Sequence, residues 1–367
     1  MDPKLFTPGP LTTSSTVKEA MLRDWGSRES EFIDTIVRIR RGTLALAGES
    51  PESGYECVPV QGSGTFGIEA LLSSAFRPGD RALVLVNGVY GARMNSILEL
   101  HGVETTVLEE EEHRAFSPTA VEKALSADAG LTHVVIVHCE TTTGVLNPVE
   151  EIGAVVRQAN RRYLIDAMSS FGGIPLTFAA SKADFIVSSS NKCIEGVPGF
   201  AFVLAERSAL ESCKGQAKTL ALDLHAQWAA LEKNGQFRFT PPTHAMLAFD
   251  RALVELEEEG GVAARNARYA GNQARLVEGM RALGFETIVP EAEQSPIITT
   301  FLEPDHPNYD FDQLHAALKR RGCAIYPGKL ASGAAFRVGS VGQLFREDIE
   351  TLLAAMKGSL TELGIEL

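Results

Sequence analysis

Short apolar runs alternate with helical stripes along the first part of the chain. The apolar runs predict strands buried on both faces, because a strand with one face in water alternates polar and apolar residues instead. These runs are 81–86, 105–108, 132–138, 163–165, 184–187 and 200–205. Apolar residues at helical spacing occupy 17–23, 31–46, 66–74, 90–100, 118–126 and 149–159. The alternation predicts an α/β fold with a mostly parallel sheet covered by helices.

The pattern changes after residue 205. Helical spacing continues through 209–234 and 245–259, Gly260 and Gly261 interrupt it, and a long helix is predicted at 263–283. Beyond that helix, strands are predicted near 286–289, 297–302, 323–326 and 335–338, with helices at 311–321 and 346–363. The mixed order predicts a smaller C-terminal α+β domain, 261–367, after a large domain and N-terminal arm, 1–260.

The composition, with 44% apolar and 22% charged residues, is that of an ordinary globular enzyme. The net charge of −13 argues against a nucleic-acid-binding surface, which needs clustered basic residues. The five cysteines include no C-x-x-C pair and the eight histidines no H-x-x-x-H pair, so we predict neither a disulfide framework nor a metal site. There is no basic-then-apolar leader and no apolar run of about 18 residues. We therefore expect a cytoplasmic protein without a membrane partner.

Lys192 lies between the predicted strands 184–187 and 200–205, after small polar residues and before a turn rich in glycine and proline. Lysine is rarely buried without a partner. A lysine enclosed between buried strands loses its proton readily and becomes a nucleophilic amine. The alternative is an ordinary surface lysine on a loop.

Polar groups also follow other predicted strands. Asp166 ends the strand 163–165, where a buried carboxylate needs a cationic partner unless it only caps the next turn. The stretch 62–65 precedes a helix, and its glycines, backbone N–H groups and the hydroxyls of Ser63 and Thr65 would suit an anion. A simple helix cap is the alternative there.

The run 186–200 resembles the lysine segment of class V pyridoxal-phosphate (PLP) aminotransferases. Further similarities follow in order along nearly the whole chain, from the arm 7–13 (TPGPLTT) to Lys329 and Arg337. The resemblance implies aminotransferase fold type I and PLP as the cofactor. Within the family the chain is most similar to enzymes that move the amino group of 2-aminoethylphosphonate to pyruvate, giving phosphonoacetaldehyde and L-alanine.

The resemblance also implies roles for individual residues. Lys192 would form a Schiff base with PLP, and Asp166 would contact the pyridinium nitrogen so that the ring accepts electrons. The other implied cofactor-binding residues are Ser63, Gly64 and Thr65 at the phosphate, Tyr90 stacked on the ring, Thr141 at the ring oxygen, and Asn191 beside the lysine. Tyr90 as core filler and Thr141 as a turn residue are the alternatives.

Two segments of the C-terminal half complete the resemblance. The segment 237–244 resembles one that reaches across a dimer interface, which implies a homodimer in which Thr240 contacts the neighbour's cofactor phosphate. Phe237 stands where relatives carry Trp or Tyr. Arg337 would bind the phosphonate or carboxylate of the substrate, unless it forms an ion pair between domains. Arg28 stands where relatives carry an aromatic residue followed by acidic ones, and we interpret it as an exposed charge rather than as a second anion-binding group.

Three other functions are considered. An alanine:glyoxylate or serine:pyruvate-type transaminase of the same class differs only in details of the pocket. A cysteine desulfurase needs a cysteine on the loop before Arg337, and the stretch 329–335 has none. A non-catalytic binding protein could share the fold, but the presence of Lys192, Asp166 and Arg337 together argues against it.

Overall fold

The computed structural model describes residues 2–328 and 333–367. Lys329, one of the positions to which the family resemblance extends, lies outside the described residues. The helices are α1 (Ser15–Glu19), α2 (Ser30–Leu46), α3 (Gly64–Ala75), α4 (Val89–Leu100), α5 (Pro118–Ala127), α6 (Val149–Gln158), α7 (Phe178–Ser181), α8 (Arg207–Ser212), α9 (Leu224–Asn234), α10 (Thr243–Glu259), α11 (Gly261–Ala282), α12 (Phe311–Arg320) and α13 (Arg346–Leu363), with a 3-10 turn at Glu291–Glu293. None of the described helices is long and apolar enough to cross a membrane.

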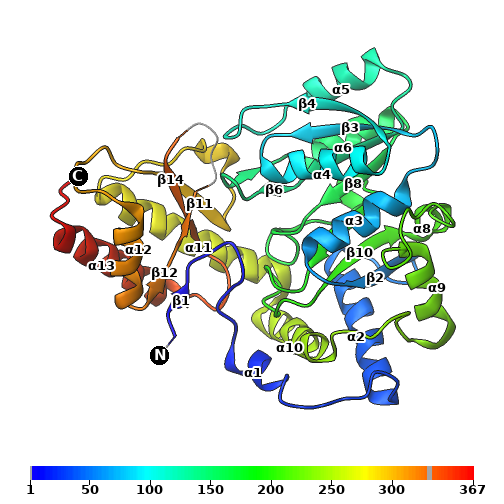
Figure 1. The fold of residues 1–367 in the computed structure, drawn as a ribbon, viewed down its shortest axis with the longest axis horizontal. Helices are drawn as coiled ribbons and strands as arrows, with labels where there is room; N and C mark the ends of the chain where they lie inside the picture. The colour runs from blue at the N-terminus through cyan, green and yellow to red at the C-terminus, as the bar shows by residue number, and fades with distance from the viewer. Residues whose placement is uncertain (1, 329–332) are drawn as a thin grey trace.

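The strands are β1 (Lys4–Leu5), β2 (Tyr55–Gln61), β3 (Arg81–Val86), β4 (Glu104–Glu109), β5 (His133–Val137), β6 (Cys139–Glu140), β7 (Val145–Leu146), β8 (Arg162–Asp166), β9 (Phe185–Ser189), β10 (Phe200–Glu206), β11 (Ile298–Leu302), β12 (Cys323–Ala324), β13 (Tyr326–Pro327) and β14 (Ala335–Gly339). Seven of them form one sheet in the order β2-β10-β9-β8-β5-β3-β4 (Figure 1). The pairs from β9 to β4 are parallel, and β10 runs antiparallel to both β9 and β2. The expected α/β sheet is confirmed, and the carboxyl ends of β2, β3, β5, β8 and β9 meet at one edge.

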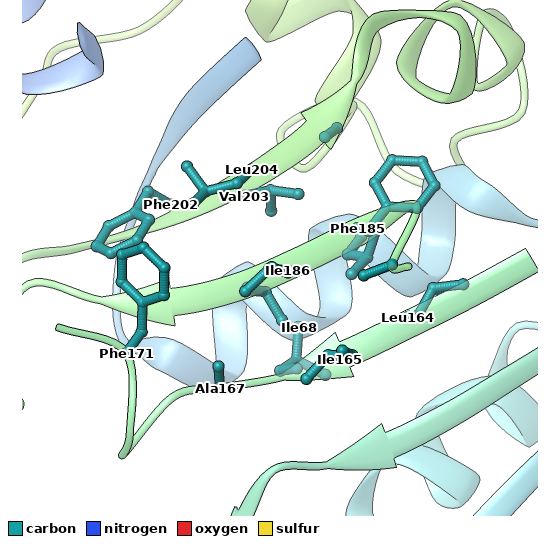
Figure 2. Packing of buried hydrophobic residues seen from close by; sticks show 14 of the residues in the cluster. Ile68, Leu164, Ile165, Ala167, Phe171, Phe185, Ile186, Phe202, Val203 and Leu204 are labelled. Carbon is teal, nitrogen blue, oxygen red and sulfur yellow. The ribbon is translucent and has the colours of Figure 1, made fainter. Parts of the chain in front are cut away.

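Helix α3 packs closely on this sheet and so places its own first turn at that edge. Figure 2 shows Ile68 of α3 directed towards Ile165 of β8, with Ile186 of β9 beside them, and all three are buried. Gly67 allows the close approach, because an added Cβ would collide with the Cβ of Ala201 in β10. The start of α3 is therefore fixed by apolar packing rather than by its own polar groups.

A second apolar core lies in the C-terminal part of the chain. There β11, β14 and β13 form an antiparallel sheet, and α11, α12 and α13 pack with it. Phe301 and Phe336 stack in this core with ring centroids 5.7 Å apart. The N-terminal arm belongs to it as well, because β1 pairs in parallel with β12 and Phe6 is buried in the same cluster. The division at residue 260 stays a prediction.

Four expected elements are wrong. The stretch 17–23 is helical only as far as Glu19, where α1 ends. The stretch 209–234 is two helices, since α8 ends at Ser212 and Asp223 caps α9 by accepting a hydrogen bond from Ala226 N. The stretch 286–289 makes only a single bridge to β11, so it is no strand. The stretch 323–326 is divided between β12 and β13, which pair with different partners. Apolar spacing alone does not show where such short segments find hydrogen-bond partners.

Candidate active site

The carboxyl ends of the sheet strands and the first turns of α3 and α4 surround a cavity of about 210 Å³. Its lining residues are Ser63, Gly64, Thr65, Ile68, Tyr90, Arg93, Met94, Val137, Cys139, Asp166, Met168, Ser169, Ser189, Asn191 and Lys192. All the predicted cofactor-binding residues except Thr141 and Thr240 are among them. The fold thus gathers groups from five separate stretches of the sequence.

Lys192 reaches this cavity next to the N-terminal arm. Its Nζ donates a hydrogen bond to Pro8 O at 3.2 Å. Gly9 lies so close, at a φ of 130°, that an added Cβ would collide with Nζ. Burial lowers the pKa of the Lys192 ammonium, and the charge of Arg337 acts in the same direction. The amine therefore loses its proton more readily than a surface lysine does, as a Schiff-base nucleophile must.

Asp166 ends β8 with only 5% of its surface exposed. Its Oδ1 accepts a hydrogen bond from Met168 N at 2.8 Å, and in the described part of the chain no cation forms an ion pair with it. Burial raises the pKa of Asp166 to about 7, although the Met168 N–H opposes the shift. A positively charged group in the cavity would supply the missing partner and return the carboxylate to its ionised form.

The start of α3 supplies the cavity with donors. Ser63 is the N-cap residue, and its side chain makes no capping hydrogen bond. Gly64 and Thr65 are the first helical residues, so their N–H groups have no acceptor within the helix. A side chain at Gly64 would collide with Met168. This turn offers backbone amides, two hydroxyls and the positive end of the helix dipole to an anion.

Arg93 is a cavity residue that the sequence interpretation missed. It lies on α4 one turn after Tyr90, with its guanidinium 4.9 Å from the centre of the Tyr90 ring. Its Nη1 donates a hydrogen bond to Thr65 Oγ1 at 3.1 Å. The spacing of three residues from Tyr90 is the signal that could have found it, because residues three apart share a helix face.

Glu140 is a second residue that the sequence interpretation missed. It is fully buried, and its Oε2 accepts hydrogen bonds from Tyr90 N and Gly91 N at 3.2 and 3.3 Å. Its Oε1 accepts from the backbone N and the hydroxyl of Thr142. Burial raises the pKa of Glu140, although the bonds from Thr142 oppose this. The carboxylate caps the start of α4 and thereby fixes Tyr90.

Arg337 lies in β14 with 3% of its surface exposed. Its Nη1 donates to Thr141 O at 2.8 Å and its Nε to Pro327 O at 3.1 Å. Among the described residues it forms no ion pair, so the interdomain salt bridge considered above is not what holds it. Thr141 is buried beside this guanidinium and does not line the cavity. The arginine is thus oriented by carbonyl groups, and no carboxylate of the described residues forms an ion pair with it.

Thr240 lies apart from this cavity. It is exposed and borders a separate surface hollow with Arg28, Phe237 and Phe239. Its backbone O accepts a hydrogen bond from Gln61 Nε2 at 2.8 Å. Thr240 therefore contributes nothing to the cavity of its own chain, and Arg28 is exposed as expected.

These groups fit pyridoxal phosphate. Asp166 is a buried carboxylate that forms no ion pair among the described residues, so it is free to pair with a pyridinium nitrogen. The buried hydroxyl of Ser189 also has no hydrogen-bond partner and lies in the cavity lining. The first turn of α3 suits a phosphate, and Lys192 suits an aldehyde carbon. The described residues thus leave the donors and charges that this cofactor would satisfy.

Comparison with known proteins agrees with this chemistry. The chain is 50% identical over 361 residues to 2-aminoethylphosphonate–pyruvate transaminase of Syntrophobacter fumaroxidans, covering 98% of this chain and 97% of that protein. It is 48% identical to the enzyme of that name from Vibrio cholerae, covering 97% of each. Its structure matches pyridoxamine–pyruvate aminotransferase from Mesorhizobium loti with a TM-score of 0.90, 26% identity, and 99% and 93% coverage of this and that chain. The model of the family "Aminotransferase class-V" matches residues 19–349, and the chain is a class V aminotransferase of PLP fold type I.

Proposed function

We propose that this enzyme transfers the amino group of 2-aminoethylphosphonate to pyruvate and forms phosphonoacetaldehyde and L-alanine. The observation that carries the proposal is Arg337, a buried guanidinium held by two carbonyl groups and by no carboxylate among the described residues. Such a cation binds a phosphonate or a carboxylate in a bidentate fork. The identity of 50% to an enzyme of this name, over nearly all of both chains, supports the choice of substrate.

The cavity residues divide the work of holding the cofactor. Ser63, Gly64 and Thr65 would bind its phosphate, Tyr90 its ring face and Asp166 its ring nitrogen, while Lys192 is the point of covalent attachment. Asn191 lines the cavity next to the lysine. When bound, PLP withdraws electrons from the amine-bearing carbon of the substrate and so makes the proton on that carbon acidic.

The chain's own residues then act on the substrate. Lys192 Nζ, whose ammonium is destabilised by burial, takes the proton from the amine-bearing carbon and returns it later in the cycle. Arg337 orients the anionic end, which is phosphonate in one half-reaction and carboxylate in the other. Pro8 and Gly9 lie against Lys192 and restrict the access of water to the amine.

We further propose a homodimer in which Thr240 contacts the cofactor phosphate of the neighbouring subunit. Thr240 is exposed in its own chain, and the adjacent Phe239 is a large apolar side chain with 44% of its surface exposed. Phe66, beside the phosphate-binding turn, is 52% exposed. Burying these two rings would favour association. We place the enzyme in the cytoplasm, since all five cysteines are free thiols, which suits a reducing compartment.

The visible absorption spectrum of the PLP-loaded enzyme tests the reaction. Adding 2-aminoethylphosphonate without an acceptor should remove the cofactor's long-wavelength band, and pyruvate, but not glyoxylate, should restore it. If the long-wavelength band is unchanged by 2-aminoethylphosphonate but is removed by serine, the serine:pyruvate-type alternative is favoured. The response is expected to be lost in Lys192→Ala.

A further inference from the structure

A second group of buried charges lies beside the turn that carries Lys192. Glu195 and Arg265 each have 1% of their surface exposed. Glu195 Oε1 accepts hydrogen bonds from Arg268 Nη2 at 2.8 Å and from the Tyr269 hydroxyl at 2.6 Å. Glu259 forms ion pairs with both arginines, which gives two carboxylates and two guanidinium groups in one cluster. None of these side chains takes part in the reaction described above.

This cluster fixes the backbone of the lysine turn. Glu195 N donates to Lys192 O at 2.7 Å, and Arg265 Nη1 donates to Cys193 O at 2.8 Å. Glu195 has a φ of 67°, in the left-handed region that residues other than glycine and asparagine rarely adopt. Such a conformation persists only where surrounding contacts determine it. Here the contacts are those of the Glu195 carboxylate with α11.

The same cluster holds the segment that follows β14. Gln343 Nε2 donates to Glu195 Oε2 at 3.0 Å. Arg268 Nη1 donates to Gly342 O at 2.7 Å and to Leu344 O at 3.0 Å. This segment comes directly after the strand that carries Arg337. One buried carboxylate therefore connects the turn of the reactive lysine to the strand of the anion-binding arginine.

We propose that Glu195 is a positioning residue that fixes the separation between the Lys192 amine and the Arg337 guanidinium. The substrate must reach both groups together, because its amino end reacts beside Lys192 while its anionic end binds Arg337. A small misplacement of reacting groups costs a large factor in rate. The inference rests on the proposed function only for the identity of the substrate, since the contacts themselves concern the lysine turn.

The test compares Glu195→Gln with Glu259→Gln in the PLP-loaded enzyme. Both variants remove a carboxylate from the same two arginines, but Glu259 makes no contact with the lysine turn among the described interactions. Glu195→Gln is expected to speed amide hydrogen exchange of the peptide 190–198 by about tenfold or more. It should also move the pH midpoint of the cofactor's absorption band by roughly one unit. Glu259→Gln should leave both readouts near those of the parent.

A substrate measurement completes the test. In Glu195→Gln the kcat for 2-aminoethylphosphonate should fall about tenfold, with a smaller change in KM, because the reacting groups are misplaced while the anion contact is kept. If that variant does not fold, Gln343→Ala removes one bond to Glu195 without changing charge and should change exchange in the same direction. Unchanged exchange and an unchanged band midpoint, or equal changes in Glu259→Gln, would overturn the proposal. Exchange and absorption need no substrate, so they decide this proposal even if the enzyme uses another amine.

Discussion

The molecule contains two buried groups of charges that are built differently. Asp166, which lines the cavity, and Arg337, which lies in β14, form no ion pair among the described residues. In the cluster around Glu195, each carboxylate meets at least one guanidinium, and Glu195 also accepts hydrogen bonds from the Tyr269 hydroxyl and from Gln343. Since an unpaired buried charge is unfavourable, incomplete pairing indicates a ligand and complete pairing indicates a structural support.

The largest effect on activity is expected for Lys192→Ala. The rate should fall by about 10⁴-fold or more, because the variant loses both the covalent attachment point and the group that moves the proton. Borohydride treatment followed by mass spectrometry should find the cofactor attached to the parent protein and not to the variant. A matched control is Lys182→Ala, an exposed lysine that does not line the cavity, which should keep full activity.

Asp166→Asn should stabilise the cofactor-free protein while it lowers activity. The pKa of about 7 in the folded protein lies above the ordinary aspartate value of 3.8, so the folded state binds more protons than the unfolded state between these values. The free energy of unfolding of the cofactor-free parent should therefore fall as the pH rises from about 4 to about 7. The effect is at most about 4 kcal/mol.

Chemical denaturation of the cofactor-free proteins at pH 5 and pH 8 measures this effect. The parent should lose stability between the two pH values, and Asp166→Asn should lose less. An equal pH dependence in both proteins would contradict the assignment of the shift to Asp166. With PLP bound, the difference should shrink, because the ring nitrogen then supplies a cation.

Arg337 and Arg268 allow a direct comparison of the two groups of charges, because both are arginines with little exposed surface. Arg337→Ala should raise the KM for 2-aminoethylphosphonate by about 100-fold through the lost bidentate contact, with little change in the melting temperature. Arg268→Ala should instead destabilise the protein by about 3 kcal/mol, because it leaves buried carboxylates with fewer partners. Steady-state kinetics and thermal unfolding of both variants separate the two roles. A large loss of stability in Arg337→Ala would mean that its charge is already compensated.

The smallest expected effect is that of Arg93→Met. Arg93 holds the Thr65 hydroxyl and lies over the Tyr90 ring, so its loss should weaken PLP binding by about tenfold. Fluorescence titration of the cofactor-free protein with PLP measures this directly. Arg93→Lys should recover part of the affinity by keeping the charge, and binding equal to the parent in Arg93→Met would remove this residue from the site.

Much of the cavity could be predicted from sequence because its geometry follows from the sheet. Residues that end parallel strands must meet at one edge, so Asp166, Lys192 and the stretch 62–65 could be brought together without a structure. Thr141 also follows a strand end, but it is not among the residues that line the cavity. The position of a strand end predicts where the following loop lies, and it does not predict the direction of each side chain in that loop.

The supporting contacts could not be predicted in this way. Glu140 acts on the start of another helix, and Glu195 on residues of α11 and the segment after β14. The residues that contact Glu140 and Glu195 do not lie at a regular distance from them along the chain, because these contacts arise only when separate elements pack together. The role of Thr240 and the division at residue 260 stay predictions.

The N-terminal arm covers Lys192 but is itself held in place by the C-terminal core. Pro8 and Gly9 precede the large domain in the chain, yet their neighbours β1 and Phe6 are held by β12 and by a core built from segments that follow that domain. The nascent large domain can fold earlier, since domains form as they emerge. The arm can cover Lys192 only after the C-terminal core has formed, so a large domain without that core would carry an unshielded amine.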